Sequence, residues 1–442
     1  MIKLLWVCNV PLPEIAERIG RKVPTACGWL SVYAGQLREQ VELSVLFPFP
    51  AGILPAGLPE GETGGIHYYA FPQPKAWGFL PAEDPLRATK AMKETISQVI
   101  RKVGPDILHI FGTEYVHSLV AAEAFGRPER TFVSIQGLTS QYWKYSLEGI
   151  PMAAQKAFTP SSLVRGTMLR EAERLRKRGE AEKKVISLAG HVVGRTAWDF
   201  ASVLGIHPDV HYHRINESLR EIFYEPGKRW DFYHCERQSI FMSQGSVPQK
   251  GLHIMIEAMP KILRFCPGAK LYVAGNDVAF SQSSHLRRLM RISPYGSYIR
   301  KLIFENHLEE QLVFLGPLSA EKMRDWYLRC NVFVLPSSIE NSPNSLGEAM
   351  SLGVPSVSSA VGGVPGMVQD RENGYLVHPG SSDMLALSVI SLLQDPDLCE
   401  SMGDHAARSA LAIWDREKNA QKLLQAYQLA KYHTDRCRED WE

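Results

Sequence analysis

Short apolar runs alternate with amphipathic stretches along most of this 442-residue chain, and this alternation constrains the fold more than any other feature. The runs of the first half are rich in Val, Ile, Leu and Phe and are bounded by Gly, Pro or Asp. Such runs indicate strands buried on both faces, and helices between them indicate a parallel α/β sheet. The expected strands are residues 2–7, 41–47, 107–111 and 131–135, and the expected helices are residues 29–39, 88–103 and 118–124.

The pattern breaks and then restarts in the second half. Residues 150–188 are helical in character, residues 185–194 are strand-like, residues 197–205 are helical, and residues 211–235 are irregular enough to place a domain junction there. A second series follows, with strands expected at 239–243, 269–274, 313–315, 332–336, 356–358 and 374–377, and helices at 252–265, 320–329, 345–352, 382–393, 397–410 and 417–431. Two doubly wound α/β halves are the simplest architecture, and ligands of such sheets bind beyond the carboxyl ends of the strands.

Composition argues against several classes of protein. The 49 Lys and Arg residues nearly balance the 47 Asp and Glu residues, which disfavours a dedicated nucleic-acid binder. The seven cysteines are scattered without a C-x-x-C pair, so a reducing compartment is expected rather than a disulfide framework or structural zinc. The N-terminal apolar run is too short for a signal peptide, and no run approaches the length of a membrane span. We therefore expect a cytosolic protein.

The segment 332–355 carries the most chemical information. A buried strand is expected to end at Pro336, small polar residues follow, and a helix is expected to begin near Ser345. The free N–H groups at the start of that helix form a site for an anion such as a diphosphate. Glu340 and Glu348 flank this position, and ionised carboxylates accept hydrogen bonds from hydroxyl groups. A sugar nucleotide, which has hydroxyl groups on either side of a diphosphate, fits this arrangement.

Plainer interpretations of these residues stay open. Ser345-Leu-Gly-Glu348 also matches the S-x-x-E capping box, which would explain Glu348 without any ligand. Glu340 could be a solvated carboxylate of the loop. Gly275, which closes a strand of the second half, could line a nucleotide site or could simply form a turn.

Five motifs occur in the order typical of retaining glycosyltransferase family 4, and the second half of the chain resembles that family. Glu340 and Glu348 are separated by seven residues, as in the E-x7-E motif of the family, and a Gly…Lys-Gly turn lies upstream at residues 244–251. The other matching segments are Gly-Gly-Val-Pro at 362–365, Asn-Gly-Tyr-Leu-Val at 373–377 and residues 392–403. The resemblance covers residues 235–430 well and the first half more loosely.

The resemblance implies a GT-B architecture, an α/β fold in which two Rossmann-like doubly wound domains face a cleft. It implies an acceptor-side domain at residues 1–215, a domain for the nucleotide-sugar donor at 216–415, and a helix at 416–442 that crosses back to the first domain. The implied function is a retaining glycosyltransferase that moves a sugar from a nucleotide-diphosphate sugar to an acceptor hydroxyl. Bacterial surface polysaccharide or lipid-linked glycan synthesis is the implied setting. No cofactor and no metal are expected beside the nucleotide-sugar substrate.

The resemblance also gives roles to individual residues. Lys250 and Glu340 would be catalytic, with Lys250 on the donor diphosphate and Glu340 on the sugar hydroxyls, and Glu348 would bind the ribose. The N–H groups of Ser345 and Leu346 would cap the phosphates. The other donor-binding positions would be Gly245, Ser246, Gly275 and Asn344, and the acceptor-side positions would be Gly28, Glu114, Gln136 and Gly137.

This chain departs from the family pattern at several positions. Ser246 stands where the family often has Arg, Gly366 where it often has Glu, and Cys27-Gly28 where a Gly-Gly pair is common. Gln136 stands where a His is often found. Because Gln can donate a hydrogen bond but cannot take up a proton, a positioning role is expected there rather than a base. The departures suggest a subfamily with its own donor or acceptor.

Two rival functions remain at this stage, a sugar-nucleotide 2-epimerase on the same fold and a non-catalytic nucleotide- or glycan-binding module of a polysaccharide-assembly complex. Asp395-Pro-Asp397 resembles a metal-binding D-x-D, although its place between two helices favours a turn and a cap. The histidines at 207, 211 and 213 have weak zinc spacing. Residues 165–184 hold eight Lys or Arg against four Glu, so this helix is either a solvated face or a peripheral contact with the inner membrane face.

Overall fold

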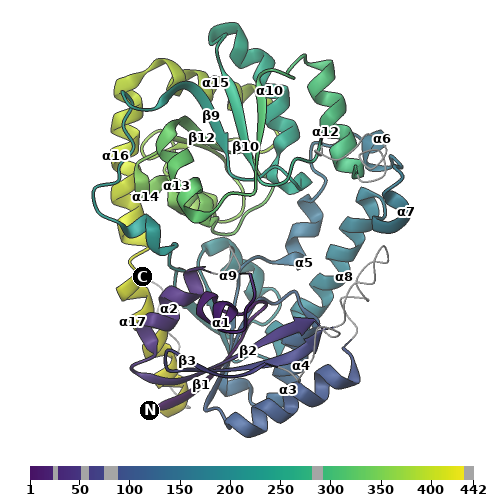
Figure 1. The fold of residues 1–442 in the computed structure, drawn as a ribbon, viewed down its shortest axis with the longest axis vertical. Helices are drawn as coiled ribbons and strands as arrows, with labels where there is room; N and C mark the ends of the chain where they lie inside the picture. The colour runs from purple at the N-terminus through teal and green to yellow at the C-terminus, as the bar shows by residue number, and fades with distance from the viewer. Residues whose placement is uncertain (23–27, 51–58, 74–87, 281–291, 433–442) are drawn as a thin grey trace. The chain divides into compact units, whose positions relative to one another are not determined.

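The structure is a computed structural model that describes residues 1–22, 28–50, 59–73, 88–280 and 292–432 (Figure 1). The chain divides into two compact units. Unit 1 comprises Met1–Gln141, Leu175–Arg220 and Trp414–Glu442, and unit 2 comprises Tyr142–Arg174 and Glu221–Ile413. Within the described part of the chain, no helix is both long and apolar enough to cross a membrane.

Unit 1 is built on an eight-stranded sheet with the order β3-β4-β2-β1-β5-β6-β7-β8 among the described residues. All neighbouring strands are parallel except β3 and β4, which form an antiparallel hairpin. The strands are β1 (Ile2–Val7), β2 (Val41–Pro50), β3 (Glu60–Thr63), β4 (Ile66–Gln73), β5 (Ile107–Phe111), β6 (Thr131–Ser134), β7 (His191–Gly194) and β8 (His211–Arg214). The helices are α1 (Pro13–Arg18), α2 (Gly28–Leu37), α3 (Lys90–Val103), α4 (Val116–Phe125), α5 (Thr139–Tyr142), α9 (Ala197–Leu204) and α17 (Arg416–Tyr432), with the short η1 (Pro128–Arg130).

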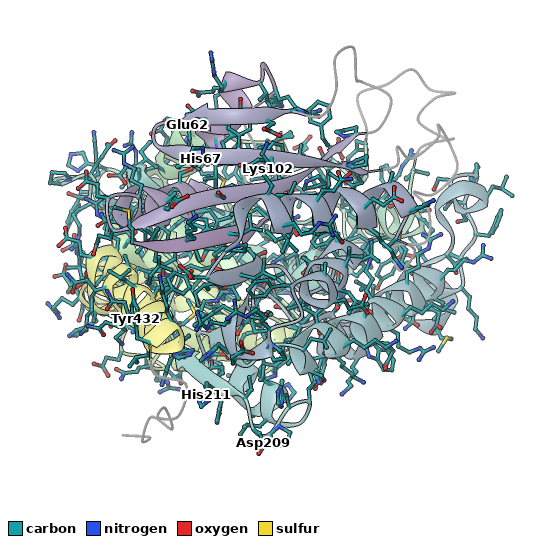
Figure 2. All side chains as sticks on the ribbon, turned by 90° about the horizontal axis from the view of Figure 1, so that it is seen from below. Glu62, His67, Lys102, Asp209, His211 and Tyr432 are labelled. Atoms are coloured by element: carbon teal, nitrogen blue, oxygen red, sulfur yellow. The ribbon has the colours of Figure 1, made fainter. Side chains whose placement is uncertain are left out.

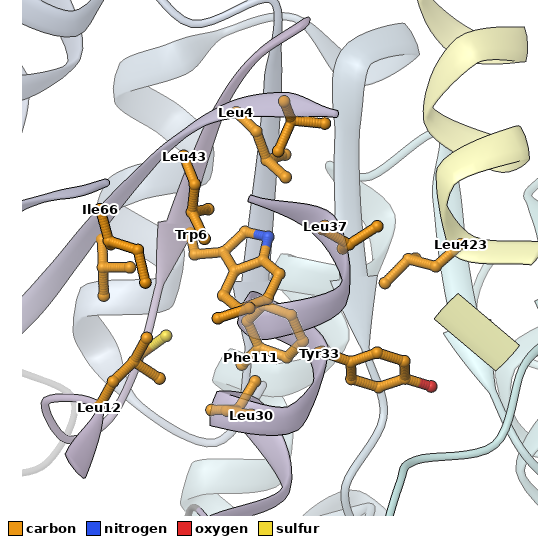
Figure 3. Close-up of a cluster of buried hydrophobic side chains, with 14 of the residues drawn as sticks. Leu4, Trp6, Leu12, Leu30, Tyr33, Leu37, Leu43, Ile66, Phe111 and Leu423 are labelled. Atoms are coloured by element: carbon orange, nitrogen blue, oxygen red, sulfur yellow. The ribbon is translucent and has the colours of Figure 1, made fainter. Parts of the chain in front are cut away.

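Strand β1 shows why this sheet is buried on both faces. Successive side chains of a strand point to opposite faces, and Leu4 and Trp6 belong to one apolar cluster while Leu5 and Val7 belong to another. In the first cluster Trp6 meets Phe111 edge-on, with ring centroids 5.0 Å apart (Figure 3). Helices α2 and α17 cover this face, and helices α3 and α4 cover the other.

The edge strands of the unit 1 sheet carry polar side chains. Figure 2 shows Glu62 and His67 on the β3–β4 hairpin and His211 on β8, and strands β3 and β8 form the two edges of the sheet within the described residues. Lys102 of α3 pairs with the carboxylate of Glu60 on the outermost strand β3. Charged side chains on an edge strand disfavour pairing with a further strand, which is a common protection of open sheets.

The described residues of unit 2 form a six-stranded, all-parallel sheet with the order β11-β10-β9-β12-β13-β14. Its strands are β9 (Glu236–Met242), β10 (Lys270–Ala274), β11 (Leu312–Gly316), β12 (Cys330–Leu335), β13 (Ser356–Ser359) and β14 (Tyr375–Val377). Its helices are α6 (Met152–Gln155), α7 (Ser162–Arg165), α10 (Leu252–Phe265), α12 (Pro294–Glu305), α13 (Ala320–Arg329), α14 (Asn344–Leu352), α15 (Ser382–Gln394) and α16 (Pro396–Ile413), with the short η2 (Trp143–Tyr145), η3 (Glu221–Tyr224), η4 (Pro248–Lys250) and η5 (Val364–Gly366). Helix α8 (Met168–Ser187) contributes residues to both units.

The unit boundaries differ from the expected ones at residues 142–174, which were expected in the first domain. These residues are tied to unit 2 by hydrogen bonds. Ser338 Oγ donates to the carbonyl of Tyr145 at 2.8 Å, and the His253 ring donates to the carbonyl of Glu148 at 3.0 Å. The last helix, α17, packs on α2, β1 and β5 of unit 1.

Other expectations fail at the level of elements. Residues 185–190 are not a strand, because α8 continues to Ser187 and buries Val185 and Ile186 in the unit 1 core. Strand β8 was not expected because its sequence, His-Tyr-His-Arg, is polar and lies at a sheet edge. The hairpin β3–β4 and helix α12 were also not expected.

Candidate functional site

The residues expected to bind a donor gather at the carboxyl ends of the unit 2 strands. Gly245 and Ser246 follow β9, Gly275 follows β10, and the loop after β12 leads into α14. Because these strands are parallel neighbours, their carboxyl ends lie along one edge of the sheet.

The loops after β9 and β10 lie against each other. A Cβ at Gly245 would come within 2.8 Å of side-chain atoms of both Leu252 and Val273, so any larger residue would have to displace them. Gly275 has φ +93°, and a Cβ placed on it would lie 3.5 Å from Ser246 Oγ. Ser246 therefore stands beside Gly275, and the position where the family often has Arg carries a short neutral hydroxyl.

The turn that carries Lys250 is clamped to the end of β12. Gly251 has φ +73°, and a Cβ there would lie 1.9 Å from the carbonyl oxygen of Pro336. The backbone N–H of Ser338 donates to the carbonyl of Gln249 at 2.9 Å. Left-handed backbone geometry and the lack of room both require glycine at 251. The Lys-Gly pair thus brings Lys250 to the loop that carries Glu340.

Lys250 and Glu340 form an ion pair with 2.5 Å between Nζ and Oε1. The same Oε1 accepts a hydrogen bond from Ser337 Oγ at 2.8 Å. Glu340 is 6% exposed, which rules out the interpretation of a solvated loop carboxylate. A buried carboxylate is costly unless it is paired, and Lys250 provides that partner.

The backbone of Glu340 is fixed from the other side. Its carbonyl accepts from the N–H of Gly363 at 3.1 Å. Gly362 has φ +52°, and a Cβ there would lie 1.9 Å from the same carbonyl oxygen. The Gly-Gly pair of the Gly-Gly-Val-Pro motif therefore allows this segment to pack directly on the Glu340 loop.

Helix α14 begins one residue earlier than expected, at Asn344, and this rules out the capping box. Its N-cap is Pro343, which makes no side-chain cap, so Ser345 lies inside the helix rather than at its N-cap. The N–H of Leu346 donates to the carbonyl of Pro343 at 3.0 Å and is thus already used. The N–H of Ser345 makes no backbone–backbone hydrogen bond within the described residues, which makes it the better candidate to meet a phosphate.

Glu348 is buried in the same helix, with 4% of its surface exposed. The hydroxyl of Tyr327 lies 3.4 Å from Glu348 Oε2 and donates to the carbonyl of Ser345 at 3.0 Å. Tyr327 of α13 therefore holds the first turn of α14. The sequence alone indicates no role for Tyr327, nor for Ser337, whose hydroxyl donates to Glu340.

The acceptor-side residues all lie in unit 1. Gly28 opens α2, and a Cβ there would lie 3.4 Å from the aliphatic chain of Arg220. Gln136 and Gly137 follow β6, and Arg195 donates from Nη2 to the carbonyl of Gln136 at 2.7 Å. Arg195 is itself buried and paired with Glu217 at 2.9 Å. This pair fixes the backbone at Gln136, a link that the sequence did not indicate.

Glu114 follows β5 and has a carboxyl group removed from water. Burial, reinforced by the negative charge of Glu182, raises its pKa to about 7. The neighbouring His117 is a core residue, stacked on Tyr115 and hydrogen-bonded to Asn9 at 3.1 Å, and burial lowers its pKa to about 3. Of these two residues, Glu114 is the one suited to meet a ligand.

The two metal-like patterns have structural explanations. Asp395 caps α16 by accepting from the N–H of Leu398 at 2.9 Å. His213 is buried and hydrogen-bonded to His191, with 3.0 Å between ring nitrogens. Within the described residues, no group of three or more His, Cys, Asp and Glu side chains is arranged to hold a metal ion.

Known protein sequences are similar to the part of the chain that forms unit 2. Residues 232–409 match the family described as Glycosyl transferases group 1. The chain is 27% identical over 237 residues to a D-inositol 3-phosphate glycosyltransferase of Streptomyces coelicolor, covering 51% of this chain and 50% of that protein. It is 27% identical over 195 residues to a GDP-mannose-dependent alpha-(1-6)-phosphatidylinositol monomannoside mannosyltransferase of Mycobacterium tuberculosis, covering 42% and 46%. The matched regions thus span about half the length of these relatives.

The whole chain is similar to a solved structure. Sucrose-phosphate synthase from Thermosynechococcus elongatus superposes with a TM-score of 0.71 at 17% identity, covering 96% of this chain and 98% of that one. This likeness shows the GT-B fold, with two doubly wound α/β units. The match of residues 232–409 to a glycosyl transferase family and the named relatives support a transferase enzyme.

Proposed function

We propose that this chain is a retaining glycosyltransferase that moves one sugar from a nucleotide-diphosphate sugar to an acceptor hydroxyl. The observation that carries the proposal is the Lys250–Glu340 pair beside the N-terminus of α14, within the segment that matches the family. The pair brings together a cation suited to a diphosphate and a carboxylate suited to sugar hydroxyls. The N–H of Ser345 adds a neutral donor to the same anion.

The proposed chemistry depends on charge stabilisation. The bond between the anomeric carbon and the diphosphate oxygen breaks, and Lys250 and the Ser345 N–H stabilise the negative charge that develops on the leaving diphosphate. The acceptor oxygen bonds to the anomeric carbon on the same face, and its proton passes to the departing phosphate. Glu340 accepts hydrogen bonds from the transferred sugar and Glu348 from the ribose, while Gly245, Ser246, Gly275 and Asn344 line the donor site. No metal or cofactor takes part.

The acceptor belongs to unit 1 in this proposal. Gly28, Glu114, Gln136 and Gly137 line its site, and Gln136 positions a substrate group without exchanging a proton. The two relatives are named for an inositol phosphate and a phosphatidylinositol mannoside, which supports a role in glycan or lipid-linked glycan assembly. We propose a cytoplasmic location, with the exposed basic side chains of residues 165–184 as a peripheral contact at the inner membrane face.

The first experiment tests the donor site by thermal unfolding with UDP, GDP, ADP and CMP at equal concentration. A ligand that binds the folded state raises the unfolding temperature by mass action. One nucleoside diphosphate is expected to stabilise the wild type and not Lys250→Ala. Lys261→Ala is the matched control, because Lys261 also pairs with a carboxylate of unit 2, that of Asp383, but lies outside the proposed site.

The second step follows the products formed from the sugar nucleotide whose base is identified. Sugar transfer to an added acceptor supports the proposal. An epimerised sugar formed without any acceptor would instead indicate the 2-epimerase. Binding of nucleotide without turnover in the presence of acceptors would indicate a non-catalytic module, and no stabilisation by any diphosphate would contradict the donor site.

A further inference from the structure

A polar cluster in unit 1 lies at the carboxyl ends of β5 and β6. It consists of Glu114 after β5, Ser140 at the start of α5, and Arg178 and Glu182 on α8, and we call it the Glu114 cluster. Helix α8 packs closely against α5 at Gly179, because this residue has no side chain. A Cβ there would lie 2.5 Å from the Cα of Ser140.

Glu182 is the structural member of this cluster. Its Oε2 accepts from Thr113 Oγ1 at 2.9 Å, from the N–H of Thr139 at 3.0 Å and from Thr139 Oγ1 at 3.1 Å. Its Oε1 accepts from the N–H of Ser140 at 2.9 Å. These bonds use both oxygens, so Glu182 fastens α8 to the ends of β5 and β6 and has little capacity left for a ligand.

The other three members have unused capacity. Glu114 Oε2, Ser140 Oγ and Arg178 Nε are buried and have no hydrogen-bond partner among the described residues. Buried polar atoms are nearly always paired, and one left unpaired costs about 1–3 kcal/mol. Glu114 Oε2 can accept a hydrogen bond, Ser140 Oγ can donate or accept one, and Arg178 Nε can donate one. Three such atoms in one cluster therefore indicate a position suited to a polar group from outside the chain.

We propose that the Glu114 cluster binds an uncharged hydroxyl group of the acceptor and selects neutral acceptors over phosphorylated ones. This inference deepens the proposed function and rests on it. The hydroxyl donates to Glu114 Oε2 and accepts from both Ser140 Oγ and Arg178 Nε, which would satisfy all three buried atoms. When Glu114 is ionised, a phosphate dianion placed here would offer its carboxylate no hydrogen-bond donor and would meet like charge.

The electrostatics of Glu114 agree with this assignment. Its pKa of about 7 means that the carboxyl group exchanges its proton near neutrality, and a hydroxyl can pair with either form. The inferred selectivity differs from that suggested by the relative named for D-inositol 3-phosphate. The difference would lie in the acceptor and not in the donor, because the cluster belongs wholly to unit 1.

The test compares matched ligands that differ by one phosphate. Binding of myo-inositol and its 1-phosphate, glucose and its 6-phosphate, and glycerol and its 3-phosphate is measured by saturation-transfer NMR titration, with and without the stabilising nucleotide. We expect at least one neutral member to bind the wild type at least about tenfold more tightly than its phosphate, the effect of one hydrogen bond to a charged group. Glu114→Ala should remove that preference, and Ser140→Ala should weaken neutral binding with less risk to folding.

The controls separate this inference from the proposed function. Glu129→Ala removes a half-exposed carboxylate elsewhere in unit 1 and should change nothing. Both cluster variants should keep the nucleotide-induced rise in unfolding temperature, whereas loss of that rise in the wild type would count against the donor site alone. Equal or tighter binding of the phosphates, binding that survives Glu114→Ala, or no neutral binding because water alone fills the cluster would each overturn the inference.

Discussion

At the scale of single residues, breaking the Lys250–Glu340 pair by replacing Glu340 should change diphosphate binding and sugar transfer in opposite directions. The Glu340 carboxylate pairs with Lys250 Nζ at 2.5 Å, and a donor diphosphate must compete for the same ammonium group. Glu340→Gln frees Lys250 and should strengthen binding of the free nucleoside diphosphate by about two- to fivefold, the worth of a partly exposed ion pair. The same variant should lower sugar transfer by about 10²-fold, since it removes a carboxylate that acts on the sugar in the transition state.

Calorimetric titration with the diphosphate and a transfer assay measure these effects separately. Asp383→Asn is the matched control, because it breaks the Lys261–Asp383 pair of the same unit and should alter neither quantity. If Glu340→Gln weakened diphosphate binding as much as Lys250→Ala does, Glu340 would be a ligand of the nucleotide rather than a competitor for Lys250.

At the scale of elements, Gly251 joins the Lys250 turn to strand β12. Gly251→Ala should destabilise unit 2 by about 2 kcal/mol or more, because left-handed geometry and overlap with the Pro336 carbonyl act together. Gly380→Ala is a matched control, since Gly380 has φ +74° but open space around it and carries the backbone cost alone. Urea unfolding of both variants gives the difference, and equal midpoints would show that the Pro336 clamp contributes nothing.

Much of the element order could be predicted because each strand and helix of a parallel sheet is a local pattern. Helices α10 and α13 have the expected bounds, and most strands lie within two residues of theirs. The failures have non-local causes. Strand β8 is stabilised by its neighbour β7 rather than by apolar residues, and α14 starts at Asn344 because the preceding Pro343 is extended.

At the scale of the whole molecule, the sequence could propose Lys250 and Glu340 separately but not their pairing across 90 positions. The Glu114 cluster is even harder to predict from the sequence. The resemblance gives Glu114 only an acceptor-side role, whereas Arg178 and Glu182 belong to a basic stretch whose charge pattern indicates either a solvated face or a membrane contact. Only the close approach at Gly179 turns that helix toward the ends of β5 and β6. Contacts of this kind depend on tertiary packing, which no local pattern encodes.

Buried histidines in both units give the whole molecule a pH-dependent stability. Burial lowers the pKa of His191 and His253 to about 4 and that of His117 and His213 to about 3, and the pKa of His109 also lies well below its ordinary value. The unfolded chain binds protons at these groups near pH 6.5 while the folded chain does not. The contribution of these histidines to the free energy of unfolding is therefore fully present above pH 6.5. It is lost as the pH falls toward 4, by up to ~1.4 kcal/mol per pH unit for each group.

Three carboxyl groups act in the opposite direction. Burial raises the pKa of Glu114 to about 7 and also raises the pKa of Glu182 and Glu257, so each gives a contribution that is present below its ordinary range and is lost as the pH rises through its folded-state pKa. The five histidines outnumber these three groups, so the net expectation is a fall in the urea midpoint between pH 6.5 and 4.5. Replacing the hydrogen-bonded pair, as His191→Gln with His213→Asn, should flatten that fall, whereas the exposed His378→Asn should leave its slope unchanged. A midpoint independent of pH across this range in the wild type would mean that these side chains gain protons as readily in the folded chain as in the unfolded one, and so that their burial does not hold them neutral.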